Sequence, residues 1–163
     1  MRECGRCAFA GGRGALQWLH GGSRRIRPIF HSAIAMTVAA RTCTASSLVE
    51  MSSGPARWWA DLPAADGGSG LHPTPHELLD AALAACTVLT VQRYARRRHY
   101  PLEGVQAQVS REPAGTVYRL RRRLELAGPL AAAQRADLLR VADACPVHQA
   151  LAGSFEVLTE LVG

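Results

Sequence analysis

Residues 73–87 read PTPHELLDAALAACT, and they contain the clearest structural signal in the chain. Thr74 can cap a helix with its hydroxyl, and Pro75 suits the first helical position because the nitrogen there needs no partner. Glu77 stands three residues after Thr74, which completes a capping box. The stretch therefore predicts the start of a helix.

The body of this helix is indicated by residues that recur at helical spacing, namely Leu79, Leu83, Cys86, Thr90 and Arg93. Pro101 cannot continue a helix and lies just beyond this pattern. We therefore expect a long helix from Pro75 to about His99. Cys86 shares a stripe with Leu79 and Leu83, so we expect it to be buried as well.

The other elements follow from shorter patterns. The stretch 62–75 holds several prolines and glycines and predicts an irregular loop. Runs of alternating or β-prone residues predict strands at Thr44–Met51, Ala56–Ala60, Val105–Arg111, Val117–Leu126 and Phe155–Leu161, with a turn near Gly115. Two further helices are expected at Leu130–Ala144 and Pro146–Leu151. This order predicts an α+β domain.

The charge of the chain is concentrated at its start. The formal net charge is +6, yet residues 1–35 hold six arginines and one acid, which leaves 13 arginines against 12 acids in residues 36–163. Residues 1–35 show no sustained periodicity, so we expect them to be disordered or a non-native extension, with Met36 as the biological start. A transit peptide is the alternative for this segment. The near-neutral remainder argues against nucleic-acid and membrane-surface partners, and no apolar run reaches the length of a membrane span.

Five cysteines and no convincing secretory signal favour reduced thiols in a cytoplasmic protein. Cys145 stands before Pro146, which can open a helix, so its sulfur would lie at the positive end of a helix dipole, which lowers a thiol pKa. His148 could be a hydrogen-bond partner one turn later, or a second zinc ligand. A zinc site would need four ligands, and the other candidates, Cys4 and Cys7, lie in the segment that we expect to be disordered or non-native. We therefore expect no metal, and we expect no cofactor either.

Three segments of the chain together resemble the OsmC/Ohr family. They are 73–87, then Tyr94-Ala-Arg-Arg, and finally Ala142-Asp-Ala-Cys-Pro-Val-His148. Gly67, Gly68 and Gly70 fit the lead-in that is usual in this family, and PLEGV at 101–105 fits its helix exit. The resemblance spans about residues 45–161, so residues 36–163 would form an OsmC-like domain.

The resemblance implies an intertwined homodimer, in which antiparallel sheets wrap long central helices. The activity implied is reduction of organic hydroperoxides, with Cys86 as the peroxidatic cysteine and Cys145 as the resolving one. A dithiol, such as a lipoylated protein, would then restore both thiols. The alternative is a non-enzymatic member of the same fold, which binds a small hydrophobic or redox-active ligand at the dimer interface.

This chain departs from the family pattern at two places. Organic hydroperoxide resistance proteins carry a glutamate ten residues before the first cysteine, where this chain has His76, which suggests altered peroxide preference or another thiol substrate. Glu77 is nine residues before Cys86, so it points to the opposite side of the helix, about 13 Å away along the axis. The arginine that would activate the thiolate is also open, with Arg41 and Arg57 as candidates upstream.

Overall fold

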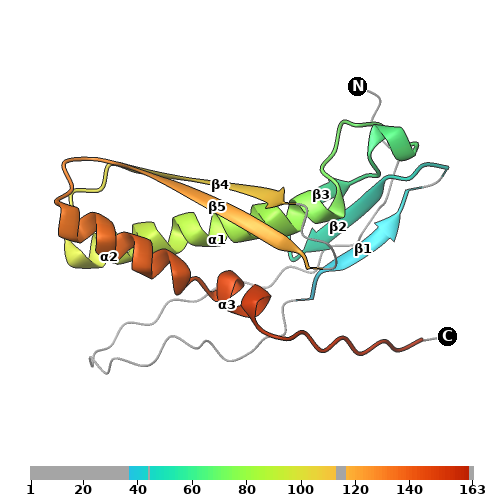
Figure 1. Ribbon diagram of the computed structural model, residues 1–163. Coiled ribbons are helices and arrows are strands. Elements are labelled where there is room, and N and C mark those ends of the chain that lie inside the picture. The colour runs from blue at the N-terminus through green and yellow to red at the C-terminus, as the bar shows by residue number, and fades with distance from the viewer. Residues whose placement is uncertain (1–36, 44, 113–116, 162–163) are drawn as a thin grey trace, which may run out of the picture. The chain divides into compact units, whose positions relative to one another are not determined.

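The computed structural model describes residues 37–43, 45–112 and 117–161. The expectations for residues 1–35 and for the turn at Gly115 lie outside these ranges. The described elements, labelled in Figure 1, are β1 (Ala39–Thr42), β2 (Val49–Ser53), β3 (Ala56–Ala60), η1 (Ala64–Asp66), α1 (Pro75–Arg98), β4 (Gly104–Glu112), β5 (Arg119–Ala127), α2 (Ala132–Asp143) and α3 (Pro146–Ala152). The predicted α+β class is confirmed.

The strands form two antiparallel sheets. The first has the order β1-β2-β3, with Met51 of β2 opposite both Ala40 and Trp58. The second is the hairpin β4-β5, in which Val109 lies opposite Arg122. The predicted strand at Ala56–Ala60 and both strands of the hairpin are confirmed, with small shifts at the ends.

The predicted strand at Thr44–Met51 is wrong over its first half, and β1 was missed. Residues 45–47 form a turn instead, in which Ala45 has a φ of 59°. The turn is closed by the hydrogen bond from the Cys43 N–H to the Leu48 carbonyl, 2.9 Å long, and by the Ser46 hydroxyl, which accepts the Leu48 N–H. Short polar side chains that bind nearby backbone favour such turns over strands.

Helix α1 begins and ends where its local sequence predicts. The Thr74 hydroxyl accepts the Glu77 N–H, and the Glu77 carboxylate accepts the Thr74 N–H at 2.7 Å, so both halves of the capping box form. His99 adopts the left-handed conformation after the last turn and stops the helix. Although α1 has 24 residues, no helix in the described ranges is long and apolar enough to cross a membrane.

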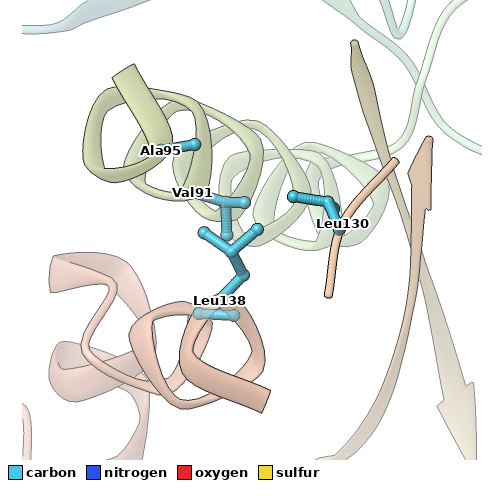
Figure 2. Close-up of a cluster of buried hydrophobic side chains, with 5 residues drawn as sticks. Val91, Ala95, Leu130 and Leu138 are labelled. Carbon is cyan, nitrogen blue, oxygen red and sulfur yellow. The ribbon is translucent and has the colours of Figure 1, made fainter. Parts of the chain in front are cut away.

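The core lies where α1 meets β4 and α2. Its buried side chains are Val91, Ala95, Leu130, Leu138 and Ala142. Figure 2 shows Val91 and Leu138 pointing toward each other from facing helices. The hairpin contributes Val105, Leu124 and Leu126 at the edge of this cluster. This packing fixes α1 against α2, and hence also fixes the chain that leads out of α2.

The predicted strand at Phe155–Leu161 is wrong. These residues form an extended segment after α3 with no secondary structure, as Figure 1 shows. Phe155, Val157, Leu158 and Leu161 are all exposed, Leu161 by 97%. Apolar residues alone do not make a strand, because its backbone groups need a neighbouring strand to pair with.

Candidate active site

Cys86 lies in the middle of α1, at the border between its buried and exposed sides. The buried stripe is formed by Leu83, Thr87, Val91 and Ala95, which follow one another at intervals of four residues. Cys86 is one position away from this stripe and is partly exposed. The expectation of a buried Cys86 is therefore wrong for the single chain, because the stripe that packs inward is shifted by one residue.

Cys145 lies at the N-terminal cap of α3, with Pro146 at the first helical position. The first turn of a helix leaves N–H groups without partners inside the helix. In α3 these include the N–H groups of Val147 and His148, and both act on the Cys145 sulfur in the direction that lowers its pKa. The side chain itself is fully enclosed.

The two thiols meet because α3 packs against α1. The thiols of Cys86 and Cys145 are hydrogen-bonded to each other, and the Val147 N–H is shared between them. Thr90 adds a hydroxyl contact to Cys86, and Thr87 adds one to Cys145. Two residues that are 59 positions apart in the sequence thus share one small polar site.

The surroundings favour ionisation of Cys145 over Cys86. Burial tends to raise the pKa of Cys145, but hydrogen bonds from the Cys86 thiol, from the N–H groups of His148 and Val147, and from the Thr87 hydroxyl outweigh it, so its pKa is lowered. Burial raises the pKa of Cys86, and the hydrogen bond to Cys145 raises it further. When the pair loses its first proton, the negative charge therefore lies mainly on Cys145 and the remaining proton on Cys86.

Arg122 of β5 is linked to this site by hydrogen bonds. One guanidinium nitrogen donates to the Thr87 hydroxyl and to the Ala142 carbonyl, both at 3.0 Å. The other donates to the Asp143 carboxylate at 2.6 Å. Only 11% of the Arg122 side chain is exposed. Thr87 also donates its own proton to the Leu83 carbonyl at 2.8 Å.

Residues 67–160 match the model of the OsmC-like protein family, which is more than half of the chain. The chain belongs to this family. None of the curated proteins matches this OsmC-like chain.

Solved structures similar to this OsmC-like protein share its fold at low sequence identity. An OsmC-like protein from Mycoplasma pneumoniae is 19% identical, with a TM-score of 0.62 over 75% of this chain and 90% of that one. An organic hydroperoxide resistance protein from Legionella pneumophila is 22% identical, with a TM-score of 0.56 over 75% and 92%. Another from Elizabethkingia anophelis is 18% identical, with a TM-score of 0.56 over 76% and 91%.

Glu77 and His76, which stand before Cys86 in this OsmC-like chain, have partners of their own. The Glu77 carboxylate is bound by the backbone and the hydroxyl of Thr74, and the N–H of Thr74 is the first cause of its lowered pKa. His76 is exposed and stacks on Tyr118, with ring centroids 5.9 Å apart. Within one chain, both side chains therefore contribute to the start of α1.

The candidate arginines and His148 are placed differently from each other. Arg41 and Arg57 both pair with Glu50 in the β1–β3 sheet, at 2.9 and 3.7 Å. The His148 ring lies 3.7 Å from the Asp143 carboxylate. The backbone N–H of His148 acts on the Cys145 sulfur and lowers its pKa. Arg122 is linked to the thiol pair by hydrogen bonds through Thr87.

Arg122 was missed by the sequence reasoning, although a signal for it exists. In β5 the partly buried positions are Leu120, Arg122, Leu124 and Leu126, which alternate with exposed ones. Arg122 thus stands in the apolar phase of an alternating strand, between exposed arginines at 121 and 123. A charged residue in that phase must find polar partners inside the protein.

Asp61 is a second residue that the sequence did not reveal. It is 4% exposed and accepts hydrogen bonds from the Ser47 hydroxyl, from the Ser69 hydroxyl and N–H, and from the Leu62 N–H. These bonds, led by the one from Ser47, hold the pKa of Asp61 far below its usual range. A side chain on Gly68 would meet the Leu62 carbonyl at 1.8 Å, so the glycine-rich loop closes tightly here.

In the part of the chain that the structure describes, no group of three or more His, Cys, Asp or Glu side chains is placed to hold a metal ion. Cys4 and Cys7 lie outside that part. The described site is thus a pair of thiols with backbone N–H, hydroxyl and guanidinium donors around it.

Proposed function

We propose that the chain is a thiol-dependent reductase of organic hydroperoxides, in which Cys86 attacks the peroxide and Cys145 resolves the product. The observation that carries the proposal is the hydrogen-bonded thiol pair, of which Cys86 is partly exposed and Cys145 is enclosed. A peroxide arriving from solvent can reach Cys86 first. The names of the Legionella and Elizabethkingia proteins support the substrate class.

The first step needs a thiolate on Cys86. The proton of Cys86 moves across the hydrogen bond to Cys145, which leaves the Cys86 sulfur as the nucleophile. This sulfur attacks the terminal peroxide oxygen and the O–O bond breaks, so Cys86 becomes a sulfenic acid and an alkoxide leaves. The alkoxide takes the proton from Cys145 and departs as an alcohol.

The second step uses the charge that is then on Cys145. Its thiolate, stabilised by the N–H groups of Val147 and His148, attacks the Cys86 sulfur, and the S–O bond of the sulfenic acid breaks. The hydroxide that leaves takes a proton from the solvent and becomes water. A disulfide forms, for which α-carbons must lie within about 7 Å. A dithiol donor, such as a lipoylated protein, then reduces the disulfide to two thiols. The proposal includes a cytoplasmic location, where such thiol reductants are present.

The proposal also includes a homodimer. One face of α1 carries Leu79, Ala82, Cys86 and Leu89 at helical spacing, and Leu89 is 65% exposed. The exposed apolar residues after α3 add to the uncovered surface. Apolar surface of this kind is usually covered by a partner. A second copy on α1 would leave Cys86 at the interface.

The test of the proposal is peroxide consumption by purified protein with a dithiol reductant. We expect turnover of tert-butyl hydroperoxide by the wild type. Cys43→Ser should also turn over, because Cys43 follows β1 and is not part of the thiol pair. Cys86→Ser should lose turnover, since no sulfur remains to attack. Full turnover by Cys86→Ser, or none by the wild type, would contradict the proposal.

The second candidate is a non-enzymatic OsmC-like protein that binds a small hydrophobic or redox-active ligand at the dimer interface. The raised pKa of Cys86, caused first by burial, is the observation that favours it. Under this alternative the cysteines serve only packing. Thiols that resist peroxide and are alkylated slowly at neutral pH would support it over the reductase.

A further inference from the structure

The Arg122 side chain is largely enclosed, and its hydrogen bonds lead toward the segments that carry the two cysteines. Thr87, which it binds, follows Cys86 directly on α1. Ala142 and Asp143, which it also binds, come just before Cys145 at the end of α2. The Ala142 carbonyl accepts the Cys145 N–H as well, at 3.3 Å. One side chain from β5 thus joins the two segments that carry the thiols.

The Thr87 hydroxyl is the shared element of these contacts. A hydroxyl has one proton to donate, and an arginine can only donate. Arg122 therefore occupies a lone pair of the Thr87 oxygen and leaves the proton for an acceptor. The structure offers two acceptors, the Leu83 carbonyl at 2.8 Å and the Cys145 sulfur. The proton can turn from the carbonyl to the sulfur when Cys145 loses its own proton.

We propose that Arg122 is a positioning residue of the thiol pair, which holds the Thr87 hydroxyl as a donor to Cys145 and fixes the backbone that enters Cys145. The inference rests on the proposed function, because it names what keeps Cys145 ready as the resolving thiolate. Without Arg122, both lone pairs of the Thr87 oxygen are open to the proton of the Cys145 thiol, which favours the uncharged form. Arg122 occupies one of the two acceptor positions of the hydroxyl and so favours its role as a donor to Cys145.

The charged and titratable side chains linked to the pair come from four elements. Around Cys145 they are Cys86 on α1, Arg122 on β5, Asp143 at the end of α2 and His148 on α3. Asp143 lies against the guanidinium and offsets its charge, so a direct field effect of Arg122 on the sulfurs is weakened. The hydrogen bond through Thr87 is therefore the route by which Arg122 acts.

The experiment measures how fast iodoacetamide alkylates Cys86 and Cys145 as a function of pH, with each peptide followed by mass spectrometry. The variants are Arg122→Gln and Thr87→Val, and the matched control is Arg123→Gln, which changes an exposed neighbour on the same strand. We expect Arg122→Gln to slow alkylation of Cys145 at neutral pH about fivefold, the factor that one ordinary hydrogen bond is worth. Its pH profile should shift upward, while Arg123→Gln should behave as the wild type.

A double variant separates the proposed route from a general structural effect. If Arg122 acts through Thr87, then Arg122→Gln in the Thr87→Val background should add no further slowing, because the hydroxyl is already absent. Additive slowing in the double variant would overturn the proposal. An unchanged Cys145 profile in a folded Arg122→Gln protein would overturn it as well.

Thermal unfolding of each variant shows whether it is folded. Should Arg122→Gln not fold, the comparison of Thr87→Ser with Thr87→Val tests the same hydroxyl, and equal Cys145 profiles in these two would overturn the proposal. Alkylation needs no peroxide, so this result is independent of turnover. Absence of peroxide turnover in the wild type would contradict the proposed function. An unshifted pH profile of Cys145 alkylation in Arg122→Gln would contradict only the role of Arg122.

Discussion

Cys86 and Cys145 share a hydrogen bond, so neither thiol titrates by itself. The apparent pKa values belong to the pair, and the first proton is released more readily than from an isolated buried thiol. The two residues can take different tasks, because Cys86 is partly exposed whereas Cys145 is enclosed at the cap of α3.

The position of Glu77 in the sequence suggests a role beside the reactive cysteine, but its contacts show that it caps the start of α1. We expect Glu77→Ala to lower the melting temperature by a few degrees, because Thr74 loses its partner. The rate at which peroxide oxidises Cys86 should stay within about twofold of the wild type, as expected for a residue away from the reacting sulfur. Stopped-flow oxidation beside thermal unfolding measures both, and a large loss of rate in folded protein would indicate that Glu77 reaches a second subunit.

Asp61 predicts a dependence of stability on pH. Its pKa is lowered in the folded state, first by the Ser47 hydroxyl, so the ionised form stabilises the fold above the unfolded value of about 3.9. This stabilisation is lost as the pH falls below about 4 toward the folded value. Asp61→Asn should therefore be less stable than the wild type at pH 7, and the difference should shrink in acid. Urea unfolding from about pH 7 to pH 3 measures this, and parallel curves would contradict it.

At the scale of elements, α1 could be predicted because its signals are local. Thr74, Pro75 and Glu77 define its start within four positions, and His99 marks its end. Strand β1 could not be predicted, because its residues gain their conformation only by pairing with β2. The same reason explains the error at Phe155–Leu161, where the pattern is apolar but no strand lies beside it in the described chain.

The site was predictable to a similar extent. Both cysteines stand in recognisable motifs. The role of Arg122, by contrast, follows from its hydrogen bonds to Thr87 and Asp143, which are 35 and 21 positions away in the sequence. Only the alternation along β5 pointed to it. Contacts over such separations depend on how β5 and α2 pack together, and this packing cannot be inferred from local patterns in one sequence.

The core between α1 and α2 predicts a contrast between neighbouring leucines. Leu138 is fully buried against Val91, whereas Leu139 is 56% exposed. We expect Leu138→Ala to cost about 2–5 kcal/mol of unfolding free energy, because it leaves a cavity. Leu139→Ala is the control and should cost less than about 1 kcal/mol. Guanidinium unfolding of both variants checks this, and equal losses would contradict the packing of α2.

At the scale of the whole molecule, the exposed face of α1 predicts a dimer. Leu89→Glu places a charge in the middle of this face, and burying an unpaired charge is costly. We expect the wild type to have the mass of a dimer by light scattering and Leu89→Glu to be largely monomeric. Leu139→Glu makes the same change on α2 and should remain dimeric. A monomeric wild type would contradict the dimer, and a fully dimeric Leu89→Glu would exclude this face of α1 as its interface.

The most direct test of the account is to treat the purified, reduced protein with tert-butyl hydroperoxide and to map its disulfides by peptide mass spectrometry. We expect one intramolecular disulfide between Cys86 and Cys145, with Cys43 still a free thiol, and a sulfenic acid on Cys86 in the Cys145→Ser variant. Thiols of Cys86 and Cys145 that remain reduced, or a disulfide that joins either of them to Cys43 instead, would contradict it.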